Sequence, residues 1–145
     1  MIICDSMARG LTIFALAALT LAGAALAAVP RPAALGSSPP GLWEVAGLPG
    51  AKAPARECVA EVASLAQYEH RQLNCASRII SDTGNSAVIS YECRGGDFGR
   101  SKVTALTPRS LRIETQGISE GLPFNYVLQA RRVGECARST SASAH

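Results

Sequence analysis

Residues 75–93 read CASRIISDTGNSAVISYEC, and this stretch predicts an antiparallel β-hairpin. Small or apolar side chains recur at every second position from Ala87 to Cys93, which is the period of a strand with one buried face. Residues 82–85, DTGN, have the composition of a tight turn. We therefore expect this turn to join strands at residues 76–81 and 87–93.

Further strand patterns follow downstream. Residues 102–107 and 111–116 flank Pro108, which stands where a type I turn favours proline. The glycine-rich residues 95–99 lack the Lys-Ser/Thr that completes a phosphate-binding loop, so we interpret them as a hairpin loop. A last strand is expected to carry four residues on its inner face: Phe124, Tyr126, Leu128 and Ala130.

Upstream of the hairpin, residues 41–45, GLWEV, predict a short strand and residues 57–71 predict a helix. One face of that helix carries residues at a 3.6-residue period: Cys58, Val62, Leu65 and Ala66. The start lacks a Ser, Thr, Asp or Asn cap, so we expect a shorter helix from Ser64 to Arg71. The predicted fold class is α+β, mainly an antiparallel β-meander of about five to six strands with one short helix and two disulfides.

The N-terminal region has the organisation of a cleavable export signal. Residues 11–28, LTIFALAALTLAGAALAA, carry no charge, follow Arg9 and contain the small-x-small triplet at residues 25–27. We predict a signal peptide over residues 1–28, cleaved after Ala27 or Ala28, and hence a periplasmic protein without a stable membrane anchor. A retained anchor is the alternative, but the segment is marginal for a span. Met1 and Met7 are both candidate start residues.

The rest of the chain is expected to form one domain, because 145 residues are too few for two ordinary ones. A disordered Pro/Ser-rich tether is expected over residues 29–40, the domain over 41–136, and a disordered tail over 137–145.

Four cysteines fall within the predicted domain: Cys58, Cys75, Cys93 and Cys136. In a short exported protein they predict two disulfides, and four cysteines allow three pairings. We favour Cys58–Cys75, which flanks the predicted helix, and Cys93–Cys136, which joins two predicted strands. The first pair requires the shorter helix, since a straight helix over residues 57–71 would hold its ends too far apart. The spacing fits neither a redox motif nor a metal site, and no metal or cofactor is expected.

The chain resembles a known family in three features: the opening Pro40-Gly41-Leu42-Trp43-Glu44, the four-cysteine layout and the closing Gly134-Glu135-Cys136. It is a family of small exported Gram-negative proteins catalogued as domain of unknown function 3617, and the resemblance covers residues 39–136. It implies a periplasmic location and a small, mostly antiparallel, disulfide-linked domain. It carries over no catalytic residues.

The charge pattern excludes one class of partner. A formal net charge of +3 is too small for the dense basic face that nucleic acid binding requires. Six arginines are candidates for a basic sheet face: Arg78, Arg94, Arg109, Arg112, Arg131 and Arg132. They alternate with Glu92, Glu114 and Gln129, so we expect a solvated face of mixed charge rather than a surface for anionic lipid or glycan.

No set of residues in the sequence has the pattern of a catalytic site. We interpret His70 as a surface residue at a helix C-terminus rather than a general base. Trp43, the single tryptophan, is expected in the core rather than stacked on a ligand. If the domain binds a ligand, four residues are candidates to face it: Trp43, Tyr91, Tyr126 and Leu128.

Three functional hypotheses follow. The first is a non-enzymatic periplasmic binding or accessory domain for a small apolar molecule or a protein. The second is an envelope protein–protein interaction or stress-related protein that uses an exposed strand edge. The third and weakest is a small hydrolase. A pocket lined by Tyr91, Tyr126 and Leu128 would favour the binding domain. An unpaired, exposed strand edge would favour the interaction protein. A His70 side chain hydrogen-bonded to a serine and a carboxylate would favour the hydrolase.

Overall fold

The structure is a computed structural model, and it describes residues 30–138. The predicted signal peptide and residues 139–145 of the predicted tail lie outside the described residues. Within residues 30–138, no helix has the length and hydropathy that a membrane span needs.

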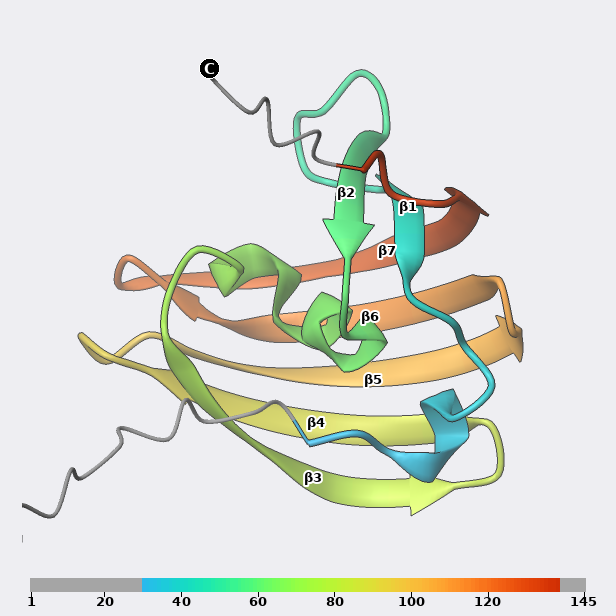
Figure 1. Cartoon of the computed structure of the whole chain (residues 1–145). Helices are drawn as coiled ribbons and strands as arrows, with labels where there is room; N and C mark the ends of the chain where they lie inside the picture. The colour runs from blue at the N-terminus through green and yellow to red at the C-terminus, as the bar shows by residue number, and fades with distance from the viewer. Residues whose placement is uncertain (1–29, 139–145) are drawn as a thin grey trace, which may run out of the picture.

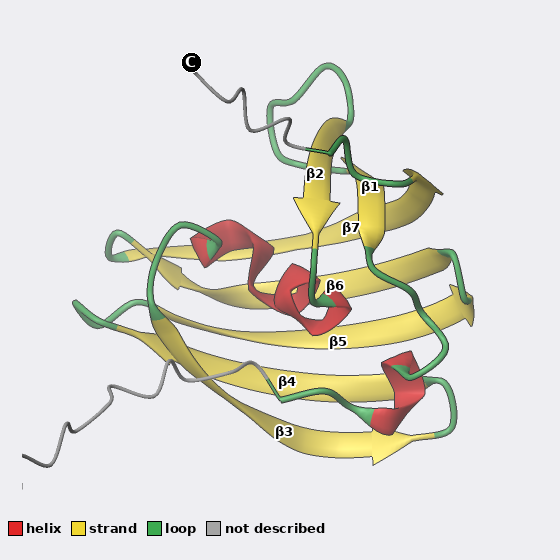
Figure 2. Cartoon of the chain, viewed as in Figure 1, coloured by secondary structure: helices red, strands yellow, loops and turns green. Residues whose placement is uncertain are grey.

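One antiparallel sheet of seven strands forms the body of the domain, with two short 3₁₀ helices, η1 and η2 (Figures 1 and 2). The strands follow the order β2-β1-β7-β6-β5-β4-β3. The elements are η1 (Ala33–Leu35), β1 (Gly41–Ala46), β2 (Ala55–Val59), η2 (Val62–His70), β3 (Cys75–Thr83), β4 (Ser86–Cys93), β5 (Phe98–Thr107), β6 (Ser110–Ser119) and β7 (Leu122–Gly134). The predicted class and the antiparallel order from residue 75 onward are confirmed, and the strand count was slightly low.

Alternation of side chains builds the core from one face of the sheet. Ala87, Ile89 and Tyr91 on β4 are buried, while the residues between them are partly exposed. The same alternation runs along β5 and β6. On β7, Leu128 and Ala130 are buried and Phe124 and Tyr126 are half-buried. The sheet curls around this face, and η2 lies across it (Figure 1).

The segment before β3 differs from the expected helix. Residues 55–59 form strand β2, which pairs with β1 from Val59 opposite Gly41 to Ala55 opposite Val45. Only residues 62–70 are helical, as 3₁₀ turns with non-helical dihedral angles at Gln67. The apolar period is nevertheless real, because Val62, Leu65 and Ala66 are buried against the sheet. A 3.6-residue period over so short a stretch cannot separate one long helix from a strand followed by two turns.

The segment expected to be a disordered tether is packed instead. Residues 33–35 form η1, and Leu35 is buried in the core. The Asp82 carboxylate accepts hydrogen bonds from the backbone N–H groups of Ala33 at 2.6 Å and Ala34 at 3.0 Å. These contacts fix η1 to the end of β3, so residues 30–40 belong to the domain.

The disulfide pairing predicted from the sequence is wrong. The bonds join Cys58 to Cys136 and Cys75 to Cys93. Leu42 of β1 lies opposite both Cys58 of β2 and Gly134 of β7, which brings the end of β7 to β2. In the β3–β4 hairpin, Cys75 and Cys93 are direct register partners. The pairing β1–β7, between the first strand and the last, is the contact that the local pattern did not predict.

The outer face of the sheet carries mixed charge, as expected. Glu44 lies within 3.6 Å of Arg131 and within 3.4 Å of Arg56, and Arg112 pairs with Glu114 at 3.3 Å. Arg132 does not belong to this face. Its side chain is buried, donates to the Pro40 carbonyl at 2.8 Å and pairs with Glu135.

Candidate functional site

The structure holds two polar features of interest, a buried cluster around His70 and an open groove beside it. His70 ends η2 and is only 3% exposed, so its expected place on the surface is wrong. Its Nδ1 lies 3.2 Å from the Tyr91 hydroxyl, and its Nε2 lies 3.7 Å from Asp97 Oδ2. Nε2 has no hydrogen-bond partner among the described residues.

Aromatic rings enclose the His70 imidazole. Tyr91 and Phe124 meet it edge-on, with ring centroids 5.5 Å and 5.7 Å away. Gly99 and Gly117 lie on the strands between these two rings, where a β-carbon would collide with Tyr91 or with the backbone of β5. The two glycines therefore leave space for the Tyr91 ring and for the close pairing of β5 with β6.

Hydrogen bonds extend the cluster along the inner face. The Ser101 hydroxyl lies 2.5 Å from the Ala66 carbonyl and 2.8 Å from Thr115 Oγ1. Burial raises the pKa of Tyr91 to about 12, although a hydrogen bond with Thr115 acts in the opposite direction. The Tyr126 hydroxyl donates to Glu69 at 2.5 Å. Burial first, and then that hydrogen bond, raise the pKa of Tyr126 well above its usual range.

His70 and Tyr91, the centre of this cluster, are almost completely buried, although His70 also lines the groove described below. A serine hydrolase needs its histidine hydrogen-bonded to a nucleophile in an accessible cleft. Among residues 30–138, no serine hydroxyl is hydrogen-bonded to His70, and its neighbour Tyr91 is buried and neutral at physiological pH. Asp97 also accepts a hydrogen bond from the Glu120 backbone at 3.0 Å, so it joins two loops.

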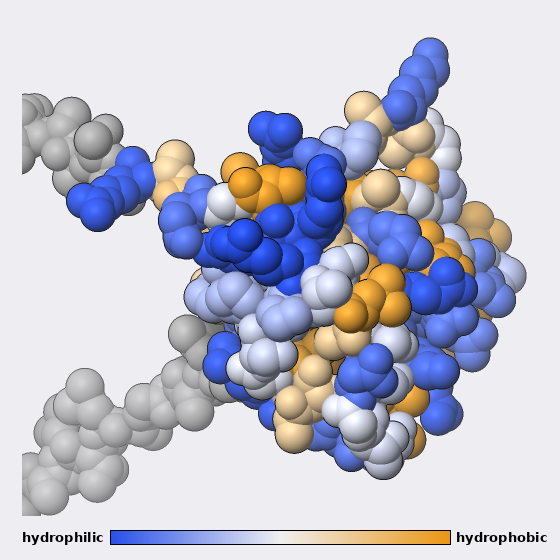
Figure 3. Space-filling view, turned by 90° about the vertical axis from the view of Figure 1, so that its right-hand side faces the viewer, coloured by the Kyte–Doolittle hydropathy of each residue, from blue (hydrophilic) through white to orange (hydrophobic). Residues whose placement is uncertain are grey.

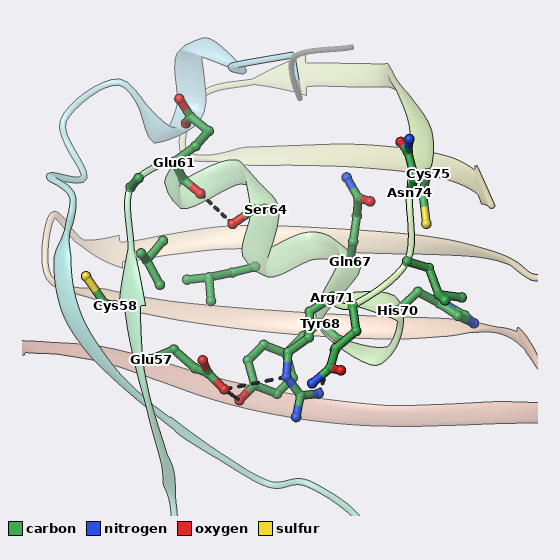
Figure 4. Close-up of a pocket in the computed structure, with 15 residues that line it drawn as sticks. Glu57, Cys58, Glu61, Ser64, Gln67, Tyr68, His70, Arg71, Asn74 and Cys75 are labelled. Carbon is green, nitrogen blue, oxygen red and sulfur yellow. Dashed lines mark hydrogen bonds and ion pairs between the residues drawn. The ribbon is translucent and has the colours of Figure 1, made fainter. Parts of the chain in front are cut away.

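The groove is a cavity of about 630 Å³ between β2, η2 and the segment that leads into β3 (Figure 4). β2 forms one wall and residues 71–75 form the other, while η2 lies between them as the floor. Several uncharged polar residues line it: Ser64, Gln67, Gln72 and Asn74. The apolar part of the lining is Val59, Ala60, Leu65 and Leu73, and His70 also lines the cavity.

Charged groups at the rim are paired within the chain. Glu57 accepts a hydrogen bond from the Tyr68 hydroxyl at 2.9 Å and lies 3.5 Å from Arg71. The Arg71 guanidinium stacks over the Tyr68 ring, 4.5 Å from its centroid. Burial, followed by the Glu57 hydrogen bond, raises the pKa of Tyr68 to about 12. Across the groove, Arg31 pairs with Glu61 at 3.0 Å.

The four candidate ligand-facing residues do not line this groove. Trp43, Tyr91 and Leu128 are buried in the interior, which confirms the core placement of Trp43. Tyr126 packs against the core and bonds to Glu69. The groove was missed because its lining comes from a strand edge, a short helix and a turn, and the helical period that includes Cys58 and Leu65 predicted a buried face rather than a cavity. The cluster of amides over Gln67, Gln72 and Asn74 is the one signal that the sequence offered.

Apolar and hydrophilic side chains are mixed on the face of the molecule drawn in Figure 3. Apolar side chains there lie as small separate areas among hydrophilic ones. The large apolar residues exposed among residues 30–138 are spread over several elements: Leu73, Ile80, Phe98, Leu106, Leu122, Val127 and Val133. Single exposed apolar residues are normal for a folded domain.

Comparison of the chain with protein-family models, curated proteins and solved structures found no match. Function therefore has to be inferred from the geometry of the groove and of the cluster behind it.

Proposed function

We propose that the chain is a non-enzymatic binding domain of the periplasm, and that the groove between β2 and η2 holds its ligand. The observation that carries the proposal is a cavity of about 630 Å³ whose two walls each contain a disulfide-bonded cysteine. Cys58 ties β2 to the chain after β7, and Cys75 ties the opposite wall to β4. A site fixed in advance loses less entropy on binding than a mobile one.

The chemistry of the lining favours binding over catalysis. Glu57 pairs with Arg71, and Glu61 pairs with Arg31, so these charged groups are already engaged within the chain. The remaining polar side chains of the lining are three amides, the Ser64 and Tyr68 hydroxyls and the His70 imidazole, and such groups orient a ligand through hydrogen bonds. This lining suits a polar ligand better than the small apolar molecule first expected.

The two disulfides support the proposed cellular compartment. Two disulfides fit an exported protein, because they persist in oxidising compartments. The periplasm is the proposed location within that class, on the strength of the predicted signal peptide and of the resemblance to the exported family noted above.

Native mass spectrometry tests the proposal. The full chain is expressed with its N-terminal segment, purified from a bacterial periplasm, and compared with two variants. Gln72→Trp places a large ring at an exposed groove position, and Gln129→Trp places the same ring at an exposed position on the outer face of β7. We expect a co-purified mass on the parent and on Gln129→Trp, and its loss on Gln72→Trp. A bound mass retained by Gln72→Trp would place the site elsewhere.

A further inference from the structure

The groove borders the free edge of β2. Three consecutive residues of that strand line it: Glu57, Cys58 and Val59. Successive side chains of a strand point to opposite faces, so a cavity that touches three in a row lies beside the edge of the strand rather than over one face. β1 occupies the other edge of β2. Within residues 30–138, the groove therefore lies along an edge that no other strand pairs with.

The second free edge of the sheet, on β3, is protected. A bulge interrupts its register between Ile79 and Ser81. η1 packs beside it and is held by Asp82. Bulges and covering elements are the devices by which proteins prevent strand addition at an edge. β2 keeps a regular register with β1 over all of residues 55–59, so it is the edge suited to receive another strand.

The lining beside β2 matches the main chain of a peptide. Amide side chains both donate and accept hydrogen bonds, as peptide groups do. Gln72 and Asn74 supply such groups along the groove, whereas the buried Gln67 already donates from its Nε2 to Ser77 Oγ at 2.6 Å. Because Glu57 and Glu61 already pair with Arg71 and Arg31, no uncompensated charge is left to select a charged side chain.

Building on the proposed function, we propose that the ligand is an extended, uncharged polar segment of a partner protein that adds as a strand to the free edge of β2. Main-chain hydrogen bonds to β2 supply affinity, and every second side chain of the segment points into the groove. The added strand lies about 4.8 Å from β2, which places it over the mouth of the cavity. The Cys58–Cys136 bond holds β2 in position for it.

The test uses short random peptides displayed on phage and selected on the disulfide-intact chain. The strongest binder is synthesised and then N-methylated at one backbone nitrogen at a time. Strand addition predicts that methylation at every second residue lowers affinity about tenfold or more, while methylation at the residues between has little effect. Gln72→Trp should lower the affinity of the chain for the unmodified peptide by a similar factor, and Gln129→Trp should leave that affinity unchanged.

The outcomes separate this inference from the proposed function. A peptide that loses affinity on Gln72→Trp but shows no two-residue alternation would bind the groove without adding to β2, which overturns strand addition alone. Failure to select any peptide, or a peptide insensitive to Gln72→Trp, also overturns it. The proposed function is then tested separately, by whether native mass spectrometry finds a bound ligand mass on the parent and not on Gln72→Trp.

Discussion

Gly99 of β5 and Gly117 of β6 stand directly opposite each other, and neither position has room for a β-carbon. At Gly99 the β-carbon would collide with the Tyr91 ring, and at Gly117 with the carbonyl oxygen of Phe98. A side chain at Gly99 would displace the Tyr91 ring, and one at Gly117 would push β6 away from the backbone of β5.

Gly117→Ala should therefore destabilise the domain by about 1–3 kcal/mol, as overpacking of a core does. The obstructing atom belongs to the backbone and cannot rotate away. Gly134→Ala is the matched control, because no atom lies within 4 Å of its β-carbon position. Urea unfolding measures both, and equal stability of Gly117→Ala and parent would show that β5 and β6 can separate at this point.

Trp43→Ala should cost about 3–5 kcal/mol, the range for deleting a large buried aromatic side chain. Trp43 is fully buried, and its Nε1 donates to the Pro39 carbonyl at 3.3 Å. Thermal or urea unfolding followed by circular dichroism measures the loss. A variant that unfolds like the parent yet no longer retains a ligand would make Trp43 a binding residue.

Removal of Cys58–Cys136 should destabilise the domain more than removal of Cys75–Cys93. The bonded residues are 78 positions apart in the first pair and 18 in the second. By chain entropy the two bonds contribute about 4.5 and about 3 kcal/mol. Double alanine variants of each pair, unfolded in urea, give the comparison. Non-reducing peptide mapping checks the pairing itself, and a Cys58–Cys75 peptide would contradict it.

Stability should fall as the pH rises above 10. The chain has three tyrosines, and the pKa of each is raised in the folded state: Tyr68 and Tyr91 to about 12, and Tyr126 further. In the unfolded chain a tyrosine loses its proton near pH 10, so between about pH 10 and 12 the folded state binds more protons than the unfolded state. The stabilisation is complete below pH 10 and is lost as the pH rises through the folded pKa values. Ultraviolet titration of the native protein should show no tyrosine ionising at pH 10, and Tyr91→Phe should flatten the decline.

Exported protein should begin at Ala28 or Val29, because the small-x-small triplet at residues 25–27 marks the cleavage site. Such cleavage keeps all of residues 30–40, which pack on the domain through η1. The intact mass of protein purified from the periplasm shows where the chain has been cleaved. A mass that includes residues 11–27 would contradict cleavage.

Short-range patterns in the sequence determined much of the fold. The alternation along residues 87–93 correctly assigned Ile89 and Tyr91 to the inner face, and the DTGN turn correctly joined β3 to β4. Both features depend on neighbouring residues, since a strand repeats every two residues and a tight turn has a local composition. The even number of cysteines likewise predicted two disulfides without reference to the fold.

Long-range contacts decided the rest. Only the pairing of β1 with both β2 and β7 brings Cys58 to Cys136, and no local pattern contains that pairing. His70 is buried because the rings of Tyr91 on β4 and Phe124 on β7, both distant from it in sequence, pack against its imidazole. The groove exists because the sheet ends at β2 while η2 lies across its inner face. An edge and a cavity are properties of how elements pack, so the sequence determined most of the strands from residue 75 onward, and the tertiary structure determined which strand edge and which cavity are left open.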